Sequence, residues 1–305
     1  MSILSKAKPA DKQVPSRESY HAKVLLLGAS KGGKSTSACT MPGKKLIIDM
    51  DRRKASLLGK PDLDILDVGD PNEPKTWTSL LTLKTELWAQ ARSNKLEYDA
   101  IIFDGVTALN RICMAYTLSL KTADGKAAAK GFGGIGPAQH HYPPQMHLII
   151  QYITSTLALP CHIIYTGHYD LFEEKGISTS GLASKTLHYW PKIYGKTRTE
   201  IATWFDESYE CYAEGQRKGK GSYYWRTIGS GSMDFLGSSL NQEGKYWESP
   251  FAVNLESKTP GFQKLFELRF GKEEKEERDS VPTDSPEDVQ ISDKTSNPIK
   301  KKEKD

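Results

Sequence analysis

Residues 24–36 read VLLLGASKGGKST, and in this stretch four apolar residues run straight into a glycine-rich turn. Residues 28–35, GASKGGKS, have the spacing of a P-loop, G-x-x-x-x-G-K-[ST]. Glycines let the main chain curl tightly enough for several backbone N–H groups to converge on phosphate oxygens. We therefore predict a strand over residues 24–27, a phosphate-binding loop after it, and a helix that begins near Lys34.

Each part of the loop has an expected role. Lys34 would reach the β- and γ-phosphates of ATP, and the Ser35 hydroxyl would bind Mg²⁺. The alternative is a glycine turn that merely joins strand to helix. The predicted nucleotide-binding residues are Gly28, Ala29, Ser30, Lys31, Gly32, Gly33, Lys34, Ser35 and Thr36.

Composition sets the class of protein. The chain has 305 residues, 37% hydrophobic and 26% charged, which suits a soluble globular protein with one large core. It has no apolar run long enough to span a bilayer, and the N-terminus MSILSKAKPADKQ lacks an apolar signal core, so we expect a cytoplasmic location. Four cysteines without a CxxC pair favour buried thiols over disulfides or a zinc site.

Charge is unevenly placed along the chain. Residues 271–305 hold 11 acidic and 8 basic residues, so this tail carries −3 and the remainder +7 of the total of +4. A basic body permits a polyanionic partner without requiring one.

The chain divides into three predicted segments. Residues 1–20 are polar and read as a flexible arm, residues 21–270 as one ATPase domain, and residues 271–305 as a disordered charged tail. Strands and helices alternate from residue 21 onward, which is typical of a mainly parallel sheet covered by helices. Strands are expected at 24–27, 45–49, 63–68, 99–104 and 162–166, and helices at 77–92 and 145–159.

Two stretches break the alternation. Residues 121–144 and 170–197 are rich in glycine and charge and lack periodicity, so we expect long irregular loops there. After them, residues 208–213 and 222–228 predict an antiparallel hairpin around the basic turn 215–221.

The segment Ala100-Ile101-Ile102-Phe103-Asp104 is an apolar strand that ends in a carboxylate, the form of a Walker B element. Parallel strands end at the same edge of a sheet, so Asp104 should lie beside Ser35 and hold Mg²⁺. The alternative is that Asp104 caps the helix that follows it.

Two further strand ends carry candidate catalytic groups. Asp49 and Asp51 follow the second strand; Asp51 would orient and deprotonate the attacking water, and Asp49 would help to hold the metal. A solvated turn balanced by Arg52 and Arg53 explains the same residues. His168 follows the strand at 162–166 and could sense the γ-phosphate, or be structural.

A resemblance rests on four segments in order after the P-loop: IIDMD at 47–51, AIIFDGVTAL at 100–109, IIYTGHYD at 163–170 and KIYGKTRTEIATWFDESYECY at 192–212. Over residues 22–240 the chain resembles phage ATPases of the RecA-like superfamily, AAA-domain nucleotide-binding proteins of which one branch is grouped with single-strand annealing recombination proteins. This resemblance implies a RecA-like P-loop NTPase, α/β with a mainly parallel central sheet flanked by helices and a C-terminal antiparallel hairpin.

The resemblance also implies partners and an assembly. ATP would lie between the subunits of a homo-oligomeric ring or filament in the cytoplasm of a bacterial host. This assembly would act on single-stranded DNA, together with a single-stranded-DNA-binding protein. In RecA-like relatives a catalytic glutamate commonly stands at the place of Asp51, and glutamine often stands at the place of His168. Lys196 and Arg198, with Lys192, are candidate cations that reach across a subunit interface.

DNA contacts would combine cations with aromatic faces on which bases stack. The two long loops offer Lys126, Lys130, Phe132, Lys185, Tyr189, Trp190 and Lys192. A solvated charged loop with buried aromatic residues is the alternative.

Four functions remain open. The first is an ATP-hydrolysing DNA recombination or repair protein of the annealing or strand-exchange type. The second is a partition-type or replication-loader ATPase, although Ala29 stands where the partition class has a lysine. The third is a small-molecule kinase, and the fourth is a nucleotide-gated scaffold that does not hydrolyse ATP.

Overall fold

A computed structural model describes residues 16–120, 137–177, 183–215, 222–255 and 257–271, all of which fall within one compact unit, Met1–Lys272. Of the predicted arm at 1–20, residues 1–15 lie outside the described residues, whereas the Tyr20 ring contacts Phe266 and Phe270. Of the predicted tail at 271–305, residues 272–305 lie outside the described residues. No helix in the described ranges is both long enough and apolar enough to cross a membrane.

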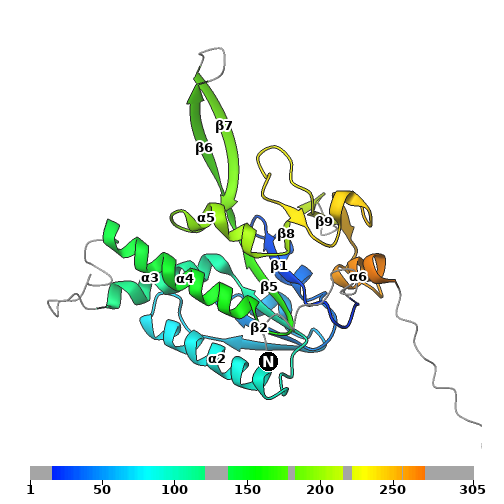
Figure 1. Cartoon of the computed structure of the whole chain (residues 1–305), viewed down its shortest axis with the longest axis horizontal. Helices are drawn as coiled ribbons and strands as arrows, with labels where there is room; N and C mark the ends of the chain where they lie inside the picture. The colour runs from blue at the N-terminus through cyan, green and yellow to red at the C-terminus, as the bar shows by residue number, and fades with distance from the viewer. Residues whose placement is uncertain (1–15, 121–136, 178–182, 216–221, 256, 272–305) are drawn as a thin grey trace, which may run out of the picture. The chain divides into compact units, whose positions relative to one another are not determined.

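One large sheet forms the centre of the unit (Figure 1). Its strands are β1 (Lys23–Leu27), β2 (Lys45–Asp49), β3 (Leu63–Asp67), β4 (Ala100–Asp104), β5 (His162–Gly167), β8 (Glu207–Glu214), β9 (Ser222–Arg226), β10 (Gly237–Ser238) and β11 (Phe251–Val253). The order is β11-β9-β8-β1-β5-β4-β2-β3, with β10 paired to β8. The pairs from β8 to β3 are parallel, whereas β9, β10 and β11 pair antiparallel.

Helices connect these strands. They are α1 (Lys34–Ala38), α2 (Pro74–Arg92), α3 (Val106–Ser119), α4 (Tyr142–Leu157), α5 (Thr197–Glu200) and α6 (Phe262–Phe270). Short 3₁₀ turns are η3 (Lys54–Leu57), η4 (Gln139–His141), η5 (Ile201–Trp204) and η7 (Gln242–Gly244). A separate two-stranded sheet pairs β6 (Tyr169–Ile177) with β7 (Ala183–Pro191).

Strand register brings the functional edge together. β5 lies between β1 and β4, so Leu27 pairs with Gly167 and Asp104 pairs with Thr166. On the other side of β4, Asp49 pairs with Asp104. The carboxyl ends of four parallel strands therefore meet at the start of the P-loop, where open α/β sheets bind their ligands.

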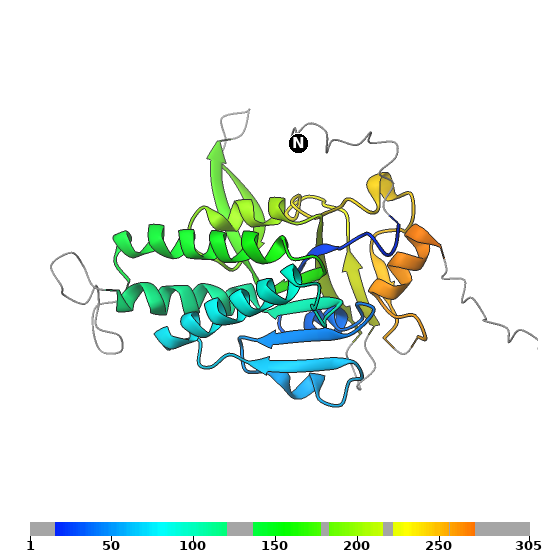
Figure 2. The same ribbon diagram turned by 60° about the horizontal axis from the view of Figure 1, so that its bottom comes forward.

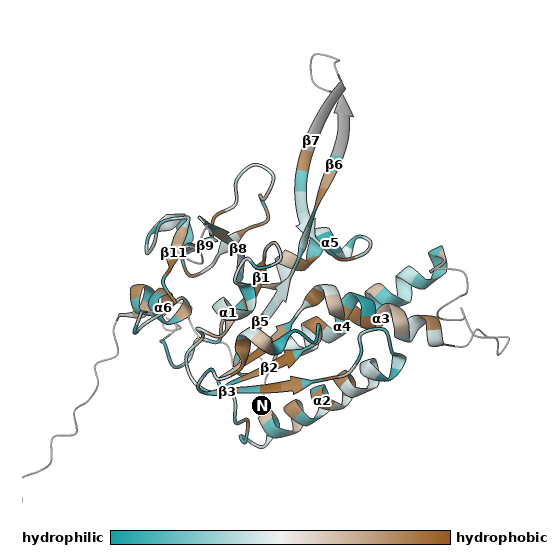
Figure 3. Ribbon diagram, turned by 180° about the vertical axis from the view of Figure 1, so that it is seen from behind, coloured by the Kyte–Doolittle hydropathy of each residue, from teal (hydrophilic) through white to brown (hydrophobic). Residues whose placement is uncertain are grey.

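Each face of the sheet has its own core. Leu25 and Leu27 point to the face covered by α2, α3 and α4, whereas Val24 and Leu26 point to the face covered by α1 and α6. This alternation follows from the two-residue period of a strand. Both faces are covered, so the middle residues of the central strands are apolar, as the brown part of β2 in Figure 3 shows. Figure 2 shows the long helices α2, α3 and α4 along one side of the sheet.

Most of the predicted elements are confirmed. The strand predicted at 45–49 has those bounds, and the strands predicted at 24–27, 63–68, 99–104 and 162–166 differ from the structure by one residue at one end. The two predicted helices begin three residues earlier, at Pro74 and Tyr142. The predicted hairpin is β8 with β9, paired antiparallel, whereas most of its basic turn, residues 216–221, lies outside the described residues.

The long loop predicted at 170–197 is wrong. Most of it is an antiparallel ribbon in which Leu171 pairs with Tyr189 and Phe172 with His188. A ribbon outside the main sheet has no wholly buried face, so its sequence lacks the apolar alternation by which strands are recognised. The loop predicted at 121–144 is wrong at its end, because η4 and α4 begin at Gln139 and Tyr142; residues 121–136 lie outside the described residues.

Candidate active site

The P-loop between β1 and α1 depends on close backbone approach. At Gly28 an added Cβ would overlap the Cys211 carbonyl oxygen of β8. Gly33 has φ of +84° and faces the Tyr223 ring, which would lie 2.7 Å from an added Cβ. Side chains at these positions would displace the loop, because neither the backbone of β8 nor a left-handed φ accommodates a Cβ. The two glycines therefore let the loop pack closely against Cys211 of β8 and Tyr223 of β9.

Lys34 is 8% exposed and bends back over the loop. Its Nζ donates to the carbonyl oxygens of Gly28, at 3.1 Å, and Ala29, at 2.8 Å. Burial lowers the pKa of the Lys34 ammonium, while the carboxylates of Asp104 and Asp51 act in the opposite direction. Lys34 and Ser35 open α1, so their N–H groups have no partner within the helix and can meet an anion.

Asp104 is held by hydroxyl groups on two sides. Ser35 Oγ donates to Asp104 Oδ2 at 2.7 Å, and Thr166 Oγ1 donates to Asp104 Oδ1. The residue at the N-cap of α3 is Gly105, without a side-chain cap, so Asp104 does not serve as the helix cap. One carboxylate oxygen and one hydroxyl oxygen thus converge at the edge of the cleft.

Asp49 is 2% exposed, and its side chain is not part of the cleft wall. Its Oδ1 accepts from the backbone N–H of Arg53 at 3.1 Å, and its Oδ2 has no hydrogen-bond partner among the described residues. Burial raises the pKa of the Asp49 carboxyl, and Asp104 adds to the rise. The structure thus makes Asp49 a buried anchor for Arg53 beside the site.

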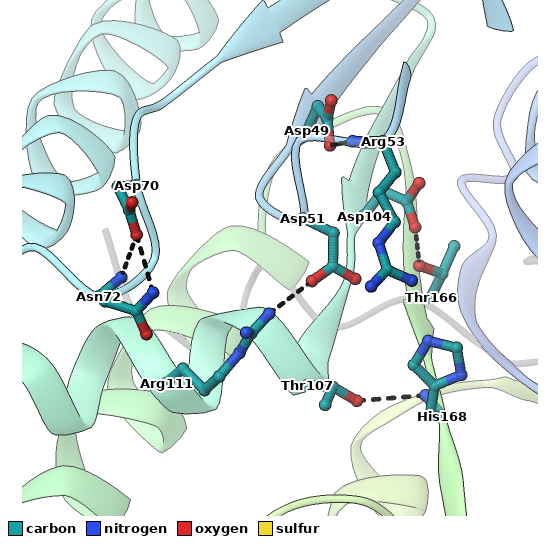
Figure 4. A network of polar contacts seen from close by, with 10 residues as sticks. All are labelled: Asp49, Asp51, Arg53, Asp70, Asn72, Asp104, Thr107, Arg111, Thr166 and His168. Carbon is teal, nitrogen blue, oxygen red and sulfur yellow. Dashed lines mark hydrogen bonds and ion pairs between the residues drawn. The ribbon is translucent and has the colours of Figure 1, made fainter. Parts of the chain in front are cut away.

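Asp51 lines the cleft and is ion-paired. Arg111 Nη2 lies 2.8 Å from Asp51 Oδ1. Arg111 stands on α3 one turn after Thr107, which faces the same cleft. Figure 4 shows the Arg111 guanidinium approaching Asp51 from that helix. This pair holds one carboxylate oxygen of Asp51 in place at the wall of the cleft.

His168 joins three elements. Its backbone N–H donates to Thr107 Oγ1 at 3.2 Å, and its carbonyl accepts from the backbone N–H of Lys192 at 2.8 Å. Its ring Nδ1 lies 3.2 Å from the Gly28 carbonyl oxygen and 3.5 Å from Lys34 Nζ. Burial lowers the His168 pKa, as does the positive charge of Lys34, and both favour the neutral ring.

These groups enclose a cleft of about 430 Å³ over the P-loop. Three cations, Lys31, Lys34 and Arg53, face two carboxylates, Asp51 and Asp104. The remaining wall consists of Ser30, Gly33, Ser35, Thr36, Ser56, Gly105, Thr107, Thr166, Gly167, His168 and Tyr223. The excess of positive charge suits an anionic ligand.

A second cleft of about 520 Å³ adjoins the first. The two share Ser30, Asp51, Arg53, Thr107 and His168. The second cleft also has Ala29, Arg111, Tyr169, Asp170 and Lys192 in its wall. Figure 4 shows several of the shared side chains gathered around one space.

The residues fit a nucleotide with Mg²⁺. The glycine-rich loop packs where a Cβ would clash with its neighbours, and its residues Lys31 and Lys34 bring positive charge to the cleft wall. Mg²⁺ is commonly held by one or two carboxylates and the substrate's phosphates, which matches Asp104 with the Ser35 hydroxyl. Within the described ranges no group of three or more His, Cys, Asp and Glu residues could hold a metal ion by itself, so phosphate oxygens would have to complete the coordination.

The weaker sequence candidates are scattered. Trp190 stacks between His188 and Phe235, with ring centroids at 5.9 and 5.4 Å, so its faces are already used. Lys192 pairs with Asp170 at 3.1 Å in the second cleft.

Neither candidate intersubunit cation lies in the wall of either cleft. Lys196 pairs with Glu200 at 2.8 Å, and Arg198 covers the Phe172 ring at 4.2 Å. Lys126, Lys130, Phe132 and the side chain of Lys185 lie outside the described residues.

Sequence reasoning gave no role in the site to several residues of the two clefts, among them Arg53, Arg111, Thr166 and Tyr223. Arg111 could have been found, because it stands four residues after Thr107 and shares its helix face. Thr166 could have been found as the last polar residue of a buried strand. Arg53 and Tyr223 had no such signal, because a turn residue and an outer strand are placed only by the fold.

A family model described as an AAA domain matches residues 21–234, more than half of the chain. The search of curated proteins found no match. The matched residues contain the P-loop, the Ser35–Asp104 pair, Asp51 and His168. A P-loop, an acidic strand end and a mostly parallel sheet flanked by helices all lie within one matched segment, and the chain accordingly belongs to the AAA domain family of nucleotide-binding ATPases.

Proposed function

We propose that this chain is a Mg²⁺-dependent ATPase that hydrolyses ATP in the cleft over the P-loop. The observation that carries the proposal is the 2.7 Å contact between Ser35 Oγ and Asp104 Oδ2, in the wall that also contains Lys34. This contact joins the P-loop to the acidic strand end, as a metal shared by both would require.

Each residue has one task. The P-loop backbone and Lys34 bind the phosphates. When ATP binds, the Lys34 ammonium releases the carbonyl oxygens of Gly28 and Ala29 and donates to phosphate oxygens instead. Ser35 and Asp104 would hold Mg²⁺, which would neutralise negative charge on the phosphates when bound. Asp51 accepts the proton of the attacking water, with one oxygen fixed by Arg111.

The test is ATP turnover and nucleotide binding in parallel. Lys34→Ala should lose nucleotide binding, and with it turnover. Asp51→Asn should keep binding and lose at least about a hundredfold in kcat, the scale of general-base catalysis. Undiminished ATP binding by Lys34→Ala would refute the site, and full turnover by Asp51→Asn would move the water-activating role elsewhere.

We further propose that the ATPase cycle acts on single-stranded DNA, as in annealing or strand exchange during phage recombination and repair. Support comes from the sequence resemblance and from the +7 charge of residues 1–270. The β6–β7 ribbon begins at the residue after His168, and β7 leads to Lys192, whose backbone N–H donates to the His168 carbonyl. A change at His168 would therefore reach both strands of this ribbon. A ring or filament of identical subunits in a bacterial cytoplasm, loaded with a single-stranded-DNA-binding protein, is part of the same proposal.

Single-stranded DNA should raise ATP turnover, and DNA affinity should fall steeply with salt. Lys192→Gln should lower the slope of log affinity against log salt by about 0.7, the effect of one phosphate contact on single strands. Lys75→Gln is the matched control, because Lys75 is also an exposed, ion-paired lysine, but on α2. Equal slopes for both variants would exclude Lys192 as a contact.

A nucleotide-gated scaffold is the second candidate. The observation that favours it is the 2.8 Å ion pair between Arg111 and Asp51. Arg111 competes with water for Asp51, which is, with Asp104, one of the two carboxylates that the described residues place in the wall of the first cleft. ATP binding without turnover, even with DNA present, would select this candidate over the ATPase.

A further inference from the structure

Arg53 is the cation at the junction of the two clefts. It lies four residues after the end of β2 and is in the wall of both. Its neighbour Arg52 turns the other way and lies 3.7 Å from Asp67 at the end of β3. Of these two consecutive arginines, Arg52 contacts the end of β3, whereas Arg53 faces the two clefts.

The backbone of Arg53 is held by a hydrogen bond to a buried carboxylate. Asp49, buried at the end of β2, accepts from the Arg53 N–H at 3.1 Å. Figure 4 shows the Arg53 side chain extending from this anchor into the space between Asp51 and Thr166. This bond fixes the backbone from which the side chain extends, so less backbone freedom is lost when Arg53 binds a ligand.

The guanidinium of Arg53 is available. Across the described residues, Arg53 forms no ion pair, whereas the other two cations of the second cleft are matched, Arg111 with Asp51 and Lys192 with Asp170. Positive charge from Arg53 also acts on His168, whose pKa it lowers. Arg53 therefore brings unneutralised charge to the point where the clefts meet.

We propose that Arg53 contacts the γ-phosphoryl group during its transfer to water, within the subunit that binds the ATP. The inference rests on the proposed ATPase function and names a further catalytic residue for it. Lys34 approaches the phosphates from the P-loop, and Arg53 approaches from the side of Asp51, where water would stand. A planar guanidinium can donate to two oxygens of the moving group.

The step balances as a hydrolysis. The water oxygen forms a bond to the γ-phosphorus while the bond from that phosphorus to the β–γ bridging oxygen breaks. The electron pair of the broken bond leaves on ADP, and the proton of the water goes to Asp51. Charge spreads over the three outer oxygens of the transferring group, and Arg53 donates to these oxygens most strongly at that point.

This assignment differs from a cation supplied by a neighbouring subunit, the role predicted for Lys196 and Arg198. Within one subunit Lys196 pairs with Glu200 and Arg198 lies over the Phe172 ring, and neither residue is in the wall of either cleft. An arginine supplied by the same chain makes each ATP site complete in one subunit, whatever oligomer forms.

The decisive experiment compares Arg53→Ala, Arg53→Lys and the control Arg52→Ala by steady-state ATP turnover and by binding of ADP with aluminium fluoride. Arg53→Ala should lose about a thousandfold in kcat, the scale of an arginine that acts on a transferring phosphoryl group, with KM within a few-fold of the unmodified protein. It should also fail to trap ADP with aluminium fluoride while still binding ADP. Arg53→Lys should recover only part of the loss, and Arg52→Ala should match the unmodified protein.

Mixing variants separates the two origins of the cation. Arg53→Ala subunits retain the P-loop, and Lys34→Ala subunits retain the arginine. If Arg53 acts within its own subunit, a mixture of the two stays inactive; recovered turnover would overturn the inference by showing action across an interface. Unchanged kcat in Arg53→Ala, or a loss confined to KM, would also overturn it, whereas ATP binding and turnover by Lys34→Ala would overturn the proposed function itself.

Discussion

Thr166 offers a direct test of how the metal-binding carboxylate is held. Its hydroxyl donates to Asp104 Oδ1, and the side chain is 1% exposed, so no water can replace it. Thr166→Val keeps the shape and removes only this donor. A hydrogen bond to a charged group contributes about 1.5–3 kcal/mol, which corresponds to roughly a 10- to 150-fold change in an equilibrium constant.

The expected effect is on Mg²⁺. Without the Thr166 hydroxyl, the bond from Ser35 is the side-chain hydrogen bond that Asp104 keeps among the described residues, and its carboxylate can rotate away from the metal. The Mg²⁺ concentration for half-maximal ATP turnover should rise by at least about tenfold, the low end of that range. The assay is ATP turnover over a Mg²⁺ titration at saturating total ATP.

Thr166→Ser supplies the control. It keeps the hydroxyl and loses one buried methyl group, which costs stability of about 1 kcal/mol but leaves the donor to Asp104 in place. Its Mg²⁺ titration should match that of the unmodified protein while its Tm falls. If Thr166→Val titrates within twofold of the unmodified protein, the hydroxyl does not position Asp104 and the reasoning is refuted.

Two further predictions concern the fold around the site. Burial lowers the pKa of His162 from 6.5 to about 3, and its Nδ1 accepts from the Ala22 N–H, so the folded state keeps this ring neutral. Because the unfolded chain binds a proton at this histidine below pH 6.5 and the folded state does not, the free energy of unfolding decreases as the pH is lowered, by about 2 kcal/mol at pH 5 from this group. Urea unfolding at pH 7 and pH 5 should show this decrease, and the variant His162→Asn should lack it. Gly28→Ala should destabilise the protein by about 1–3 kcal/mol and abolish nucleotide binding, because the new Cβ overlaps the backbone of Cys211. The control Gly237→Ala, which has open space at its Cβ, should change neither stability nor binding. Normal nucleotide binding by Gly28→Ala would contradict this account of the loop.

Local sequence was informative where a residue's role depends on its own strand. The P-loop and the strand ending in Asp104 carry their chemistry in consecutive residues, and parallel strands end at a common edge, so the meeting of Ser35 with Asp104 could be foreseen. Asp51 and His168 were placed at the same edge by the same rule, and both line the cleft.

The β6–β7 ribbon shows where local pattern fails. Its strands pair with each other outside the main sheet, so Leu171 and Leu187 remain exposed and no apolar period marks the element. Cross-strand pairs such as Phe172 with His188 exist only after the two halves meet.

By itself, the sequence determined the alternation of strands and helices, the phosphate loop and the acidic strand end, because each is encoded in a run of neighbouring residues. Tertiary structure decided which side chains share the cleft. It paired Arg111 with Asp51. It also buried Asp49, which binds the Arg53 backbone, and brought the Tyr223 ring next to Gly33. The physical reason is that strand order and register bring together residues from distant parts of the chain, and neither quantity is written in any local stretch.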